Sequence, residues 1–424
     1  MKVKKFATVV NGATPSSKHA EYYDGDIAWF TPRDLSDQGT KYVSVPERYI
    51  TQEGYDSCST TMLPAGSVLM SSRAPIGLIA ISTVPCCTNQ GFKSFVVDPN
   101  KCDSEYLYYY LKYHIKEIEA LGSGTTFKEV SKDAVENYEV FLPDVNLQKS
   151  IVQILKDIDS KIINNDIICT NLEAMAKLLY DYWFVQFDFP DKNGKPYKSA
   201  GGKMVWNDEL KREIPEGWEV HPANAYLDIV KGISYTASDL LGDGIKMLNL
   251  NSFNEDGSYK VEGIKTFSGN APNERTLLPN DLIMCATQQT DIDLSGKKNV
   301  IGKALLVPDL EETMTFSMDV CKLVTDNKKY LPFFKYQFGL PHAHKYIVGY
   351  ANGTKIKHLD VANALSLPLA MPGQDSSLID RFSDFAFSIN GKISEIIKEN
   401  QQLASLRDFL LPMLMNGQVK VGKA

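Results

Sequence analysis

The sequence predicts an α+β protein built from two repeats, each a mixed, mostly β domain followed by one long helix. The first observation is an internal repeat, because the stretch 122–143 returns without a gap at 351–372. Gly124, Thr125, Lys128 and Pro143 of the first copy match Gly353, Thr354, Lys357 and Pro372 of the second. The second observation is that short β-rich runs between glycine and proline turns precede each copy. The third is that a long segment of helical period follows each, so we expect pseudo-two-fold character.

The composition is that of an ordinary globular protein without a disulfide framework. Its 424 residues are 43% hydrophobic and 23% charged, enough for two or three domains with cores of their own. The seven cysteines are an odd number and form no Cys-x-x-Cys pair, which favours a reducing compartment. No apolar run of 18 residues occurs, so we expect a cytoplasmic protein without a membrane helix.

The charge of the chain argues against free, non-specific binding to DNA. The formal net charge is −7, and neither copy contains more basic than acidic residues. Non-specific affinity for DNA comes mainly from lysine and arginine side chains that neutralise phosphates. If this chain reads DNA, its basic side chains must gather on one face, or a partner must supply part of the affinity.

Two mixed, mostly β domains are expected, the first over residues 1–145 and the second over 217–373. A polar segment rich in glycine and proline, residues 188–216, predicts a linker before the second domain. The β-rich runs lie at 66–72, 76–81 and 92–97 in the first domain and at 278–285 and 301–307 in the second.

Two long helices are expected, over residues 146–187 and over 374–424. In both segments apolar residues recur in steps of three and four, the spacing of a coiled-coil seam. Because a folded domain separates the two segments, the natural way to bury both seams is an antiparallel coiled coil. The seam positions are Ile158, Asn165, Leu172, Leu179, Ile389, Ile396, Asn400 and Leu403.

Two of these seam positions, Asn165 and Asn400, are polar. A buried pair of asparagines would select one register of the helices at some cost in stability. Alternatively the heptad frame is displaced by one residue and both side chains are solvated. The sequence leaves both interpretations open.

No set of residues in the sequence has the spacing of a known catalytic or metal site. The strongest alternative is nuclease-like, because Asp191, Glu209 and Lys211 fit a loose pattern that can hold a metal at a scissile phosphate. That chemistry needs a rigid sheet, whereas these residues lie in a polar, turn-rich segment. His342 and His344 could share one face of a strand, but a third ligand is missing nearby and a surface loop is favoured.

A recurrent set of polar side chains is suited to reading DNA. Arginine can form two hydrogen bonds to guanine, and asparagine or glutamine to adenine, whereas Ser, Thr and Lys mostly contact phosphates. Each residue alone is also typical of a turn, so the indication is the recurrence in corresponding loops. The first copy contains Thr31, Arg33, Asp34, Ser71, Ser72, Arg73, Asn89, Gln90, Lys93, Thr125, Thr126 and Lys128. The second contains Asn249, Asn251, Thr287, Gln288, Gln289, Lys297, Lys298, Thr354, Lys355 and Lys357.

Several longer motifs occur together along the chain. They are Gly12-Ala-Thr-Pro-Ser, Thr31-Pro-Arg-Asp-Leu, Ser72-Arg-Ala-Pro-Ile-Gly, Asn89-Gln-Gly-Phe-Lys, Gly122-Ser-Gly-Thr-Thr-Phe and Leu179-Tyr-Asp-Tyr-Trp-Phe-Val-Gln-Phe-Asp. With these motifs the chain resembles the DNA-specificity subunit of type I restriction-modification systems over nearly its full length. The second copy departs from two of them, since Ala286-Thr-Gln-Gln and Ser317-Met-Asp stand in their place. Such divergence is expected of two domains that read different sequences.

The resemblance implies a non-catalytic subunit of a phage-defence system, with two target recognition domains joined by two antiparallel conserved helices. Each domain would read one half of a bipartite, asymmetric site in double-stranded DNA, and the helices would set the unread spacer. Two modification (methyltransferase) subunits would bind S-adenosylmethionine, and restriction subunits would use ATP and Mg²⁺. This chain itself would hold no cofactor and no metal.

Two other functions compete with this one. The first is a self-sufficient, metal-dependent nuclease that uses Asp191, Glu209 and Lys211. The second is a helical scaffold with no role in nucleic-acid binding, which would leave the duplicated polar loops unexplained.

Overall fold

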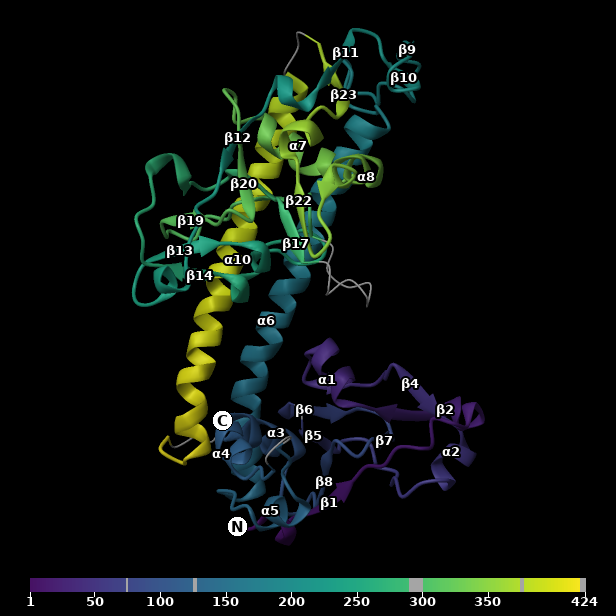
Figure 1. The fold of residues 1–424 in the computed structure, drawn as a ribbon, viewed down its shortest axis with the longest axis vertical. Helices are drawn as coiled ribbons and strands as arrows, with labels where there is room; N and C mark the ends of the chain where they lie inside the picture. The colour runs from purple at the N-terminus through teal and green to yellow at the C-terminus, as the bar shows by residue number, and fades with distance from the viewer. Residues whose placement is uncertain (74, 125–127, 290–299, 374–376, 420–424) are drawn as a thin grey trace. The chain divides into compact units, whose positions relative to one another are not determined.

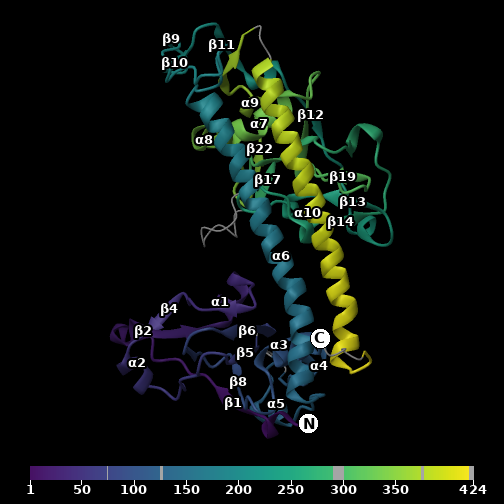
Figure 2. The ribbon, with the colours of Figure 1, turned by 180° about the vertical axis from the view of Figure 1, so that it is seen from behind.

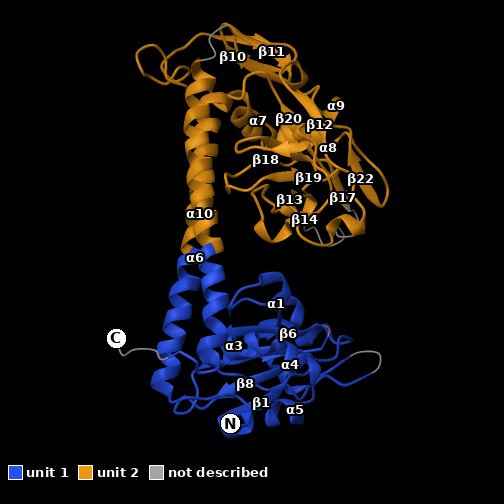
Figure 3. Cartoon of the chain, turned by 90° about the vertical axis from the view of Figure 1, so that its left-hand side faces the viewer, with its two compact units in different colours: residues 1–163, 402–424 blue, residues 164–401 orange. Residues whose placement is uncertain are grey.

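The computed structural model describes residues 1–73, 75–124, 128–289, 300–373 and 377–419. The chain divides into two compact units, which Figure 3 colours separately: unit 1 is formed by 1–163 with 402–424, and unit 2 by 164–401. The mixed helix and strand content and the long helices expected from the sequence are confirmed (Figures 1 and 2). No helix within the described ranges is long and apolar enough to cross a membrane.

Unit 1 is built on a five-stranded sheet of order β1-β8-β5-β6-β3. Its strands are β1 (Ala7–Asn11), β8 (Lys93–Val97), β5 (Val68–Ser72), β6 (Ile76–Ser82) and β3 (Tyr42–Val43). All neighbours are antiparallel except β3, which joins β6 in parallel. In a second sheet, β2 (Tyr23–Phe30) pairs antiparallel with β4 (Arg48–Ile50) and parallel with β7 (Cys87–Thr88). β-Branched and aromatic residues such as Val68 and Phe95 are fully buried between these strands and the helices.

Unit 2 repeats the order and directions of four strands of the first sheet and of three strands of the second sheet. The first sheet runs β12 (Asp228–Lys231), β20 (Val320–Val324), β16 (Leu282–Cys285) and β18 (Ala304–Leu306), all antiparallel. In the second sheet, β13 (Ile245–Leu248) pairs antiparallel with β14 (Lys265–Phe267) and parallel with β19 (Met314–Phe316), and β15 (Thr276–Leu277) extends it. Strand by strand, β12, β20, β16 and β18 therefore take the places of β1, β8, β5 and β6.

Short helices cover these sheets. In unit 1 they are α1 (Pro32–Gln38), α2 (Gln52–Asp56), α3 (Ser104–Tyr113), α4 (Ile115–Ala120) and α5 (Lys132–Asn137), and in unit 2 they are α7 (Tyr330–Phe338), α8 (Pro341–Val348) and α9 (Val361–Ala364). A further small sheet in unit 2 orders β17 (Thr287–Gln289), β22 (Ile356–Leu359) and β21 (Ala351–Asn352). The expected linker contains a hairpin of β9 (Met204–Asn207) and β10 (Arg212–Pro215), so it has regular structure of its own.

The first and last segments of each β domain lie side by side. In unit 1 the N-terminal amine donates to the Val140 carbonyl, and the Val3 amide donates to the Tyr138 carbonyl at 3.0 Å. In unit 2, β11 (Trp218–Pro222) pairs antiparallel with β23 (Pro368–Pro372). Each β domain thus closes at the point where its long helix begins.

The two long helices are α6 (Val145–Tyr180), continued by a π-helical turn at Asp181–Val185, and α10 (Ser377–Met415). Within unit 2, Asn165 contacts Asn400 while Tyr180 contacts Phe382, with ring centroids 5.5 Å apart. Later residues of α6 therefore contact earlier residues of α10, so the two helices are antiparallel. Of the expected seam residues, Ile158, Asn165 and Ile389 are buried, and Leu172, Leu179, Ile396, Asn400 and Leu403 are half-buried.

A polar layer interrupts this seam in unit 2. Asn165 is 1% exposed, and its amide nitrogen donates to Asn400 Oδ1 and Glu399 Oε2, each at 2.8 Å. Asn400 in turn donates to Asp166 at 2.9 Å, and burial, with the nearby carboxylate of Glu262, raises the pKa of Asp166. The solvated alternative is therefore wrong for Asn165.

The helix ends complete the cores of both units. In unit 2 the aromatic end of α6 places Tyr180 and Phe184 against Phe333 and Phe382, with centroid separations of 5.0–5.5 Å. In unit 1 the last turn of α10 contributes Leu414 (1% exposed) and Met415 (0% exposed) to the core formed by the N-terminal strands. The core of unit 1 therefore combines the two ends of the sequence.

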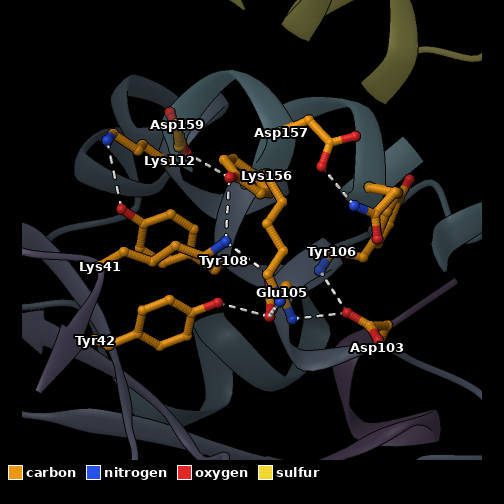
Figure 4. A network of polar contacts seen from close by, with 12 residues as sticks. Lys41, Tyr42, Asp103, Glu105, Tyr106, Tyr108, Lys112, Lys156, Asp157 and Asp159 are labelled. Atoms are coloured by element: carbon orange, nitrogen blue, oxygen red, sulfur yellow. Dashed lines mark hydrogen bonds and ion pairs between the residues drawn. The ribbon is translucent and has the colours of Figure 1, made fainter. Parts of the chain in front are cut away.

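A partly exposed polar network joins the sheet of unit 1 to its helices (Figure 4). Glu105 on α3 accepts from Lys41 at 2.7 Å, from the Tyr42 hydroxyl at 2.7 Å and from Lys156 on α6 at 3.1 Å. Burial alone would raise the pKa of Glu105, but these three donors hold it below its ordinary value. Burial lowers the pKa of Lys41, against the opposing effect of Glu105. Asp159 on α6 also pairs with Arg407 on α10 at 3.2 Å.

The polar layer predicts a specific pattern of stabilities. Replacing Asn165 by Leu leaves Asn400 and Glu399 without their shared donor, so the free energy of unfolding should fall by about 1–3 kcal/mol. The double change Asn165→Leu with Asn400→Leu should recover most of that loss, because two apolar side chains then face each other. Urea unfolding of the full chain measures both, with the exposed Asn164→Leu as control. A double variant no more stable than the single one would contradict the interpretation.

Candidate nucleic-acid interface

Five segments that are far apart in the sequence meet at one edge of unit 1. The Ala13 amide donates to the Thr88 carbonyl at 3.0 Å, and the Asn89 amide donates to the Phe30 carbonyl at 3.0 Å. The Ser72 amide donates to the Gly91 carbonyl at 2.7 Å, while its carbonyl accepts from Val130 at 3.0 Å. The edge therefore gathers the ends of β1, β2, β5 and β7 and the loop before α5, which are the segments that carry the sequence motifs.

A glycine makes this gathering possible in each unit. A Cβ atom at Gly12 would lie 2.1 Å from the Asn89 carbonyl oxygen, and one at Gly232 would lie 2.0 Å from the Ser317 carbonyl oxygen. Real Cβ atoms do not approach backbone so closely, so both positions need glycine. Gly12 and Gly232 also have equivalent positions in the strand register. The residue before Gly12, Asn11, pairs with Lys93, and the residue before Gly232, Lys231, pairs with Cys321.

The turns that face these glycines have the same backbone contacts. In unit 1 the amides of Gly91 and Phe92 donate to the side chain and the carbonyl of Asn89, at 2.8 and 3.3 Å. In unit 2 the amides of Asp319 and Val320 donate to the hydroxyl and the carbonyl of Ser317, at 3.3 and 3.0 Å. Ser317 also donates its amide to Leu248 on β13, as Asn89 does to Phe30 on β2. We name these the tip turns, residues 89–91 and 317–319.

A different polar bond fixes the neighbouring loops in each unit. In unit 1 the Lys93 ammonium, 5% exposed, lies 3.1 Å from Glu129 and 3.4 Å from the Ser72 hydroxyl. In unit 2 the Thr287 hydroxyl donates to Asp319 at 2.9 Å. The first bond joins β8 to the end of β5 and to Glu129, and the second joins β17 to the tip turn of unit 2.

Many of the sequence-predicted side chains serve the fold itself. Asp34 is 4% exposed and caps α1 by accepting from Thr31, while its other oxygen accepts from the Glu47 amide at 2.6 Å. Ser71 is buried within its hairpin, and Asn249 caps a short 3-10 turn and donates to the Gly263 carbonyl. The buried members of the predicted set, whose side chains have little surface to offer a ligand, are Asp34, Ser71, Ser72, Lys93, Asn249, Thr287 and Gln288.

The side chains that can face a ligand form a smaller set. Thr31, Arg73, Asn89 and Lys357 are half-buried, and Arg33, Gln90, Lys128, Asn251, Thr354 and Lys355 are exposed. Arg33 lies within 3.4 Å of Asp37 and 3.9 Å of Glu47, and Arg73 forms a β-bridge with Glu129. Gln289 lies on β17 opposite Ile356. Thr125, Thr126, Lys297 and Lys298 lie outside the described residues.

Sequence reasoning missed two exposed apolar residues at this edge of unit 2, Met318 and Ile356, which are 55% and 47% exposed. Met318 occupies the place that Gln90 has in unit 1, and aligning Asn89-Gln-Gly with Ser317-Met-Asp identifies the exchange. Thr14 was also missed, and its hydroxyl donates to the Gln90 side chain.

The nuclease alternative finds no support. Asp191 accepts from the amides of Asn193 and Lys195 in its own turn, and these bonds lower its pKa. Glu209 and Lys211 lie in the turn of the β9–β10 hairpin, where Lys211 is paired with Asp208 at 4.0 Å. Within the described ranges no group of three or more His, Cys, Asp or Glu side chains could hold a metal ion.

The histidine pair lies on a helix. His342 and His344 belong to α8, so the strand and the surface loop considered from the sequence are both wrong. His344 lies 3.0 Å from the Ile301 carbonyl, and burial lowers the pKa of both rings.

Comparisons with known proteins agree with this architecture. Residues 1–171 match the model of the type I restriction modification DNA specificity domain. Over 99% of its length the chain is 29% identical to the type I restriction enzyme MjaIX specificity subunit of Methanocaldococcus jannaschii, 93% of which is covered. Over 75% of its length it is 25% identical to the MjaVIII specificity subunit of the same organism, 71% of which is covered.

A solved structure with a similar fold is available for comparison. It is the S subunit of a type I restriction-modification system from M. genitalium, with a TM-score of 0.55 over 98% of this chain and 95% of that one. The sequences are only 14% identical, so the likeness is one of fold.

The close approach of the tip turn predicts opposite effects of two glycine substitutions. Gly12→Ala should destabilise unit 1 by about 1–3 kcal/mol, because the new methyl group must displace the Asn89 carbonyl. Gly391→Ala, where a Cβ meets open space within α10, should stabilise the chain by about 0.5–1 kcal/mol. Urea unfolding measures both changes. Equal stability of Gly12→Ala and the parent chain would show that the turn has room to move.

Proposed function

We propose that the chain is the non-catalytic subunit of a type I restriction-modification system that reads a bipartite DNA site, because residues 1–171 match the DNA specificity domain and 99% of the chain is similar to a specificity subunit. Each recognition domain, residues 1–145 and 217–373, reads one half. The observation that carries the proposal is the pair of tip turns, which have equivalent backbones on equivalent sheets but different exposed side chains. Two domains with the same main-chain arrangement and different exposed side chains are suited to reading two different half-sites.

The side chains at each edge suit direct readout more than strong phosphate binding. In unit 1 the exposed side chains of Arg33, Gln90 and Lys128 can reach bases or phosphates. Many of the other predicted side chains are buried or hydrogen-bonded within their own domain. A formal net charge of −7 does not favour high affinity for phosphates by the chain alone. We propose that modification subunits supply much of the phosphate contact.

The long helices, residues 146–187 and 374–424, set the spacer between the two half-sites. We propose that they form an antiparallel coiled coil, with the segment 188–216 leading to the second domain. The buried contact between Asn165 and Asn400 supports this role, because a single polar layer in an apolar seam favours one register over its neighbours. A single register of the helices would give a single distance between the two recognition domains, and therefore a single spacer length.

An exposed apolar stripe on α6 and its π-helical extension provides a face for the partner subunits. Ile167, Met175, Leu178 and Tyr182 are 52%, 54%, 66% and 37% exposed. Their spacing places them on one side of the helix over four turns. We propose that two modification subunits dock through such faces, and that S-adenosylmethionine, ATP and Mg²⁺ are bound by the modification and restriction subunits.

Exchange of one recognition domain tests the function directly. Replacing residues 217–373 by the corresponding domain of another family member should change one half of the methylated sequence and leave the other half and the spacer intact. Single-molecule methylome sequencing of a host that expresses the chimaera with its modification subunits gives the result. Replacing 1–145 should change the opposite half. Changes in both halves from either exchange would refute the proposal.

Lengthening both helices tests the spacer. One heptad inserted between Asp159 and Asn165, together with one between Asn400 and Arg407, keeps the seam in phase. Seven residues add about 10 Å, and base pairs rise by about 3.4 Å, so the spacer should lengthen by about one to three base pairs. Methylome sequencing should find both half-sequences unchanged. An unchanged spacer with active enzyme would reject the role of the helices.

A charge on the α6 stripe tests partner docking. Leu178→Asp should prevent copurification with the modification subunit, because the carboxylate would have to be buried in an apolar contact. The matched control is Val45→Asp, an equally exposed apolar residue of unit 1 (63% exposed) outside the stripe. Circular dichroism checks that both variants fold. Normal assembly of Leu178→Asp would place the docking face elsewhere.

A further inference from the structure

We propose that Met318 determines the specificity of the second recognition domain by contacting the 5-methyl group of a thymine in the major groove. The inference rests on the proposed function and adds to it the chemical class of one base contact. It also assigns Gln90 as the residue with the same position in the first domain.

The two tip turns share their main-chain hydrogen bonds and differ in their side chains, of which Gln90 and Met318 are the exposed ones. In both units the residue before the tip is fixed by a main-chain bond to the neighbouring strand and by the close approach of a glycine. In unit 2, Met318 also donates its own amide to the Ile233 carbonyl at 2.9 Å. The main chain that carries the tip is therefore held on both sides, and the side chain is the part that differs.

The side chain of Met318 is exposed to solvent, although residues next to it are buried. Its neighbours Ser317 and Val320 are 0% and 1% exposed, whereas Met318 itself is 55% exposed. Ile356, on the β22 strand that pairs with β17, adds a second exposed apolar side chain (47%) at the same edge. A single exposed methionine would be unremarkable on a protein surface. Its place in a turn whose main chain is hydrogen-bonded to two neighbouring segments, with glutamine at the corresponding position of unit 1, indicates a recognition role.

The chemistry of the base edges distinguishes the two tips. In the major groove the thymine methyl is the apolar feature of the base edges, whereas adenine offers one acceptor and one donor to an amide side chain. The thioether of Met318 has no strong donor or acceptor, so it complements the methyl group. Gln90 accepts a hydrogen bond from Thr14, and its side-chain amide group can still donate to an acceptor on a base edge. The two domains would thus read different bases from equivalent positions.

The first experiment exchanges the tips in the full chain, expressed with its modification subunits. By methylome sequencing, Met318→Gln should change one or two positions in a single half-site, and Gln90→Met should change positions in the other half only. Leu278→Gln is the matched control, because Leu278 is 54% exposed and precedes β16 at the end opposite the tip turn. Unchanged half-sites for both tip variants in methylating complexes would overturn the proposal.

The second experiment removes the methyl group from the DNA. Duplexes carry the site found for the parent complex, with each thymine of the half-site assigned by domain exchange replaced in turn by uracil. One replacement should weaken binding by about fourfold, the effect expected of one buried methyl group. A complex with Met318→Ala should not distinguish the two duplexes. If every uracil duplex binds the parent complex as tightly as the thymine duplex, the proposal is wrong.

The outcomes separate this inference from the function on which it rests. Domain exchange that fails to alter either half-site would defeat the proposed function, and the tip experiments would then lose their basis. Domain exchange that alters one half-site, together with tip variants that alter none, would overturn the assignment of Met318 alone.

Discussion

The antiparallel pairing of α6 with α10 is the interaction on which the rest of the structure depends. A helix of this length is not stable through its own hydrogen bonds alone and needs an apolar face to bury. Here the seams of the two helices bury each other, and each β domain adds its aromatic core to one stretch of the pair. Tyr180 shows this dependence most clearly, because it is fully buried among side chains from α7 and α10. Removal of either helix would therefore expose core residues of a β domain as well as the seam.

The two edges that carry the tip turns combine a similar main-chain arrangement with different side chains. Gly12 and Gly232 permit the same close approach, and Asn89 and Ser317 support the same turn with different side chains. The stabilising bonds beneath the two edges also differ, with an ion pair to Lys93 in one unit and a hydroxyl–carboxylate bond to Thr287 in the other. The main-chain arrangement at these edges is thus compatible with different buried polar bonds as well as with different exposed side chains in the tip turns.

The sequence predicts the helices better than the site, for physical reasons. Apolar spacing over more than five helical turns averages out local exceptions, so the two long helices and the burial of Ile158 and Ile389 could be predicted. Ser, Thr, Asn and Asp, in contrast, are favoured equally by caps, turns and DNA contacts. Asp34 is a cap and Ser71 a turn residue, and only the three-dimensional contacts distinguish them from Gln90. Met318 could not be predicted from the sequence, because the search for DNA contacts selected polar side chains. Its proposed role becomes visible only by comparison with Gln90, the residue at the corresponding position of unit 1.

The composition of the unit 1 core has a consequence for the order in which the protein is made. Leu414 and Met415, near the end of the chain, are buried with Val3 and Phe6 from its beginning. During synthesis the first 163 residues therefore emerge long before the residues that complete their core, and the seam of α6 waits equally long for α10. The nascent N-terminal unit must persist with uncovered apolar surface while unit 2 is translated, a state in which aggregation competes with folding. The core of unit 1 is thus completed only after unit 2 has been translated, and loss of the last turn of α10 would damage the packing around Val3 and Phe6.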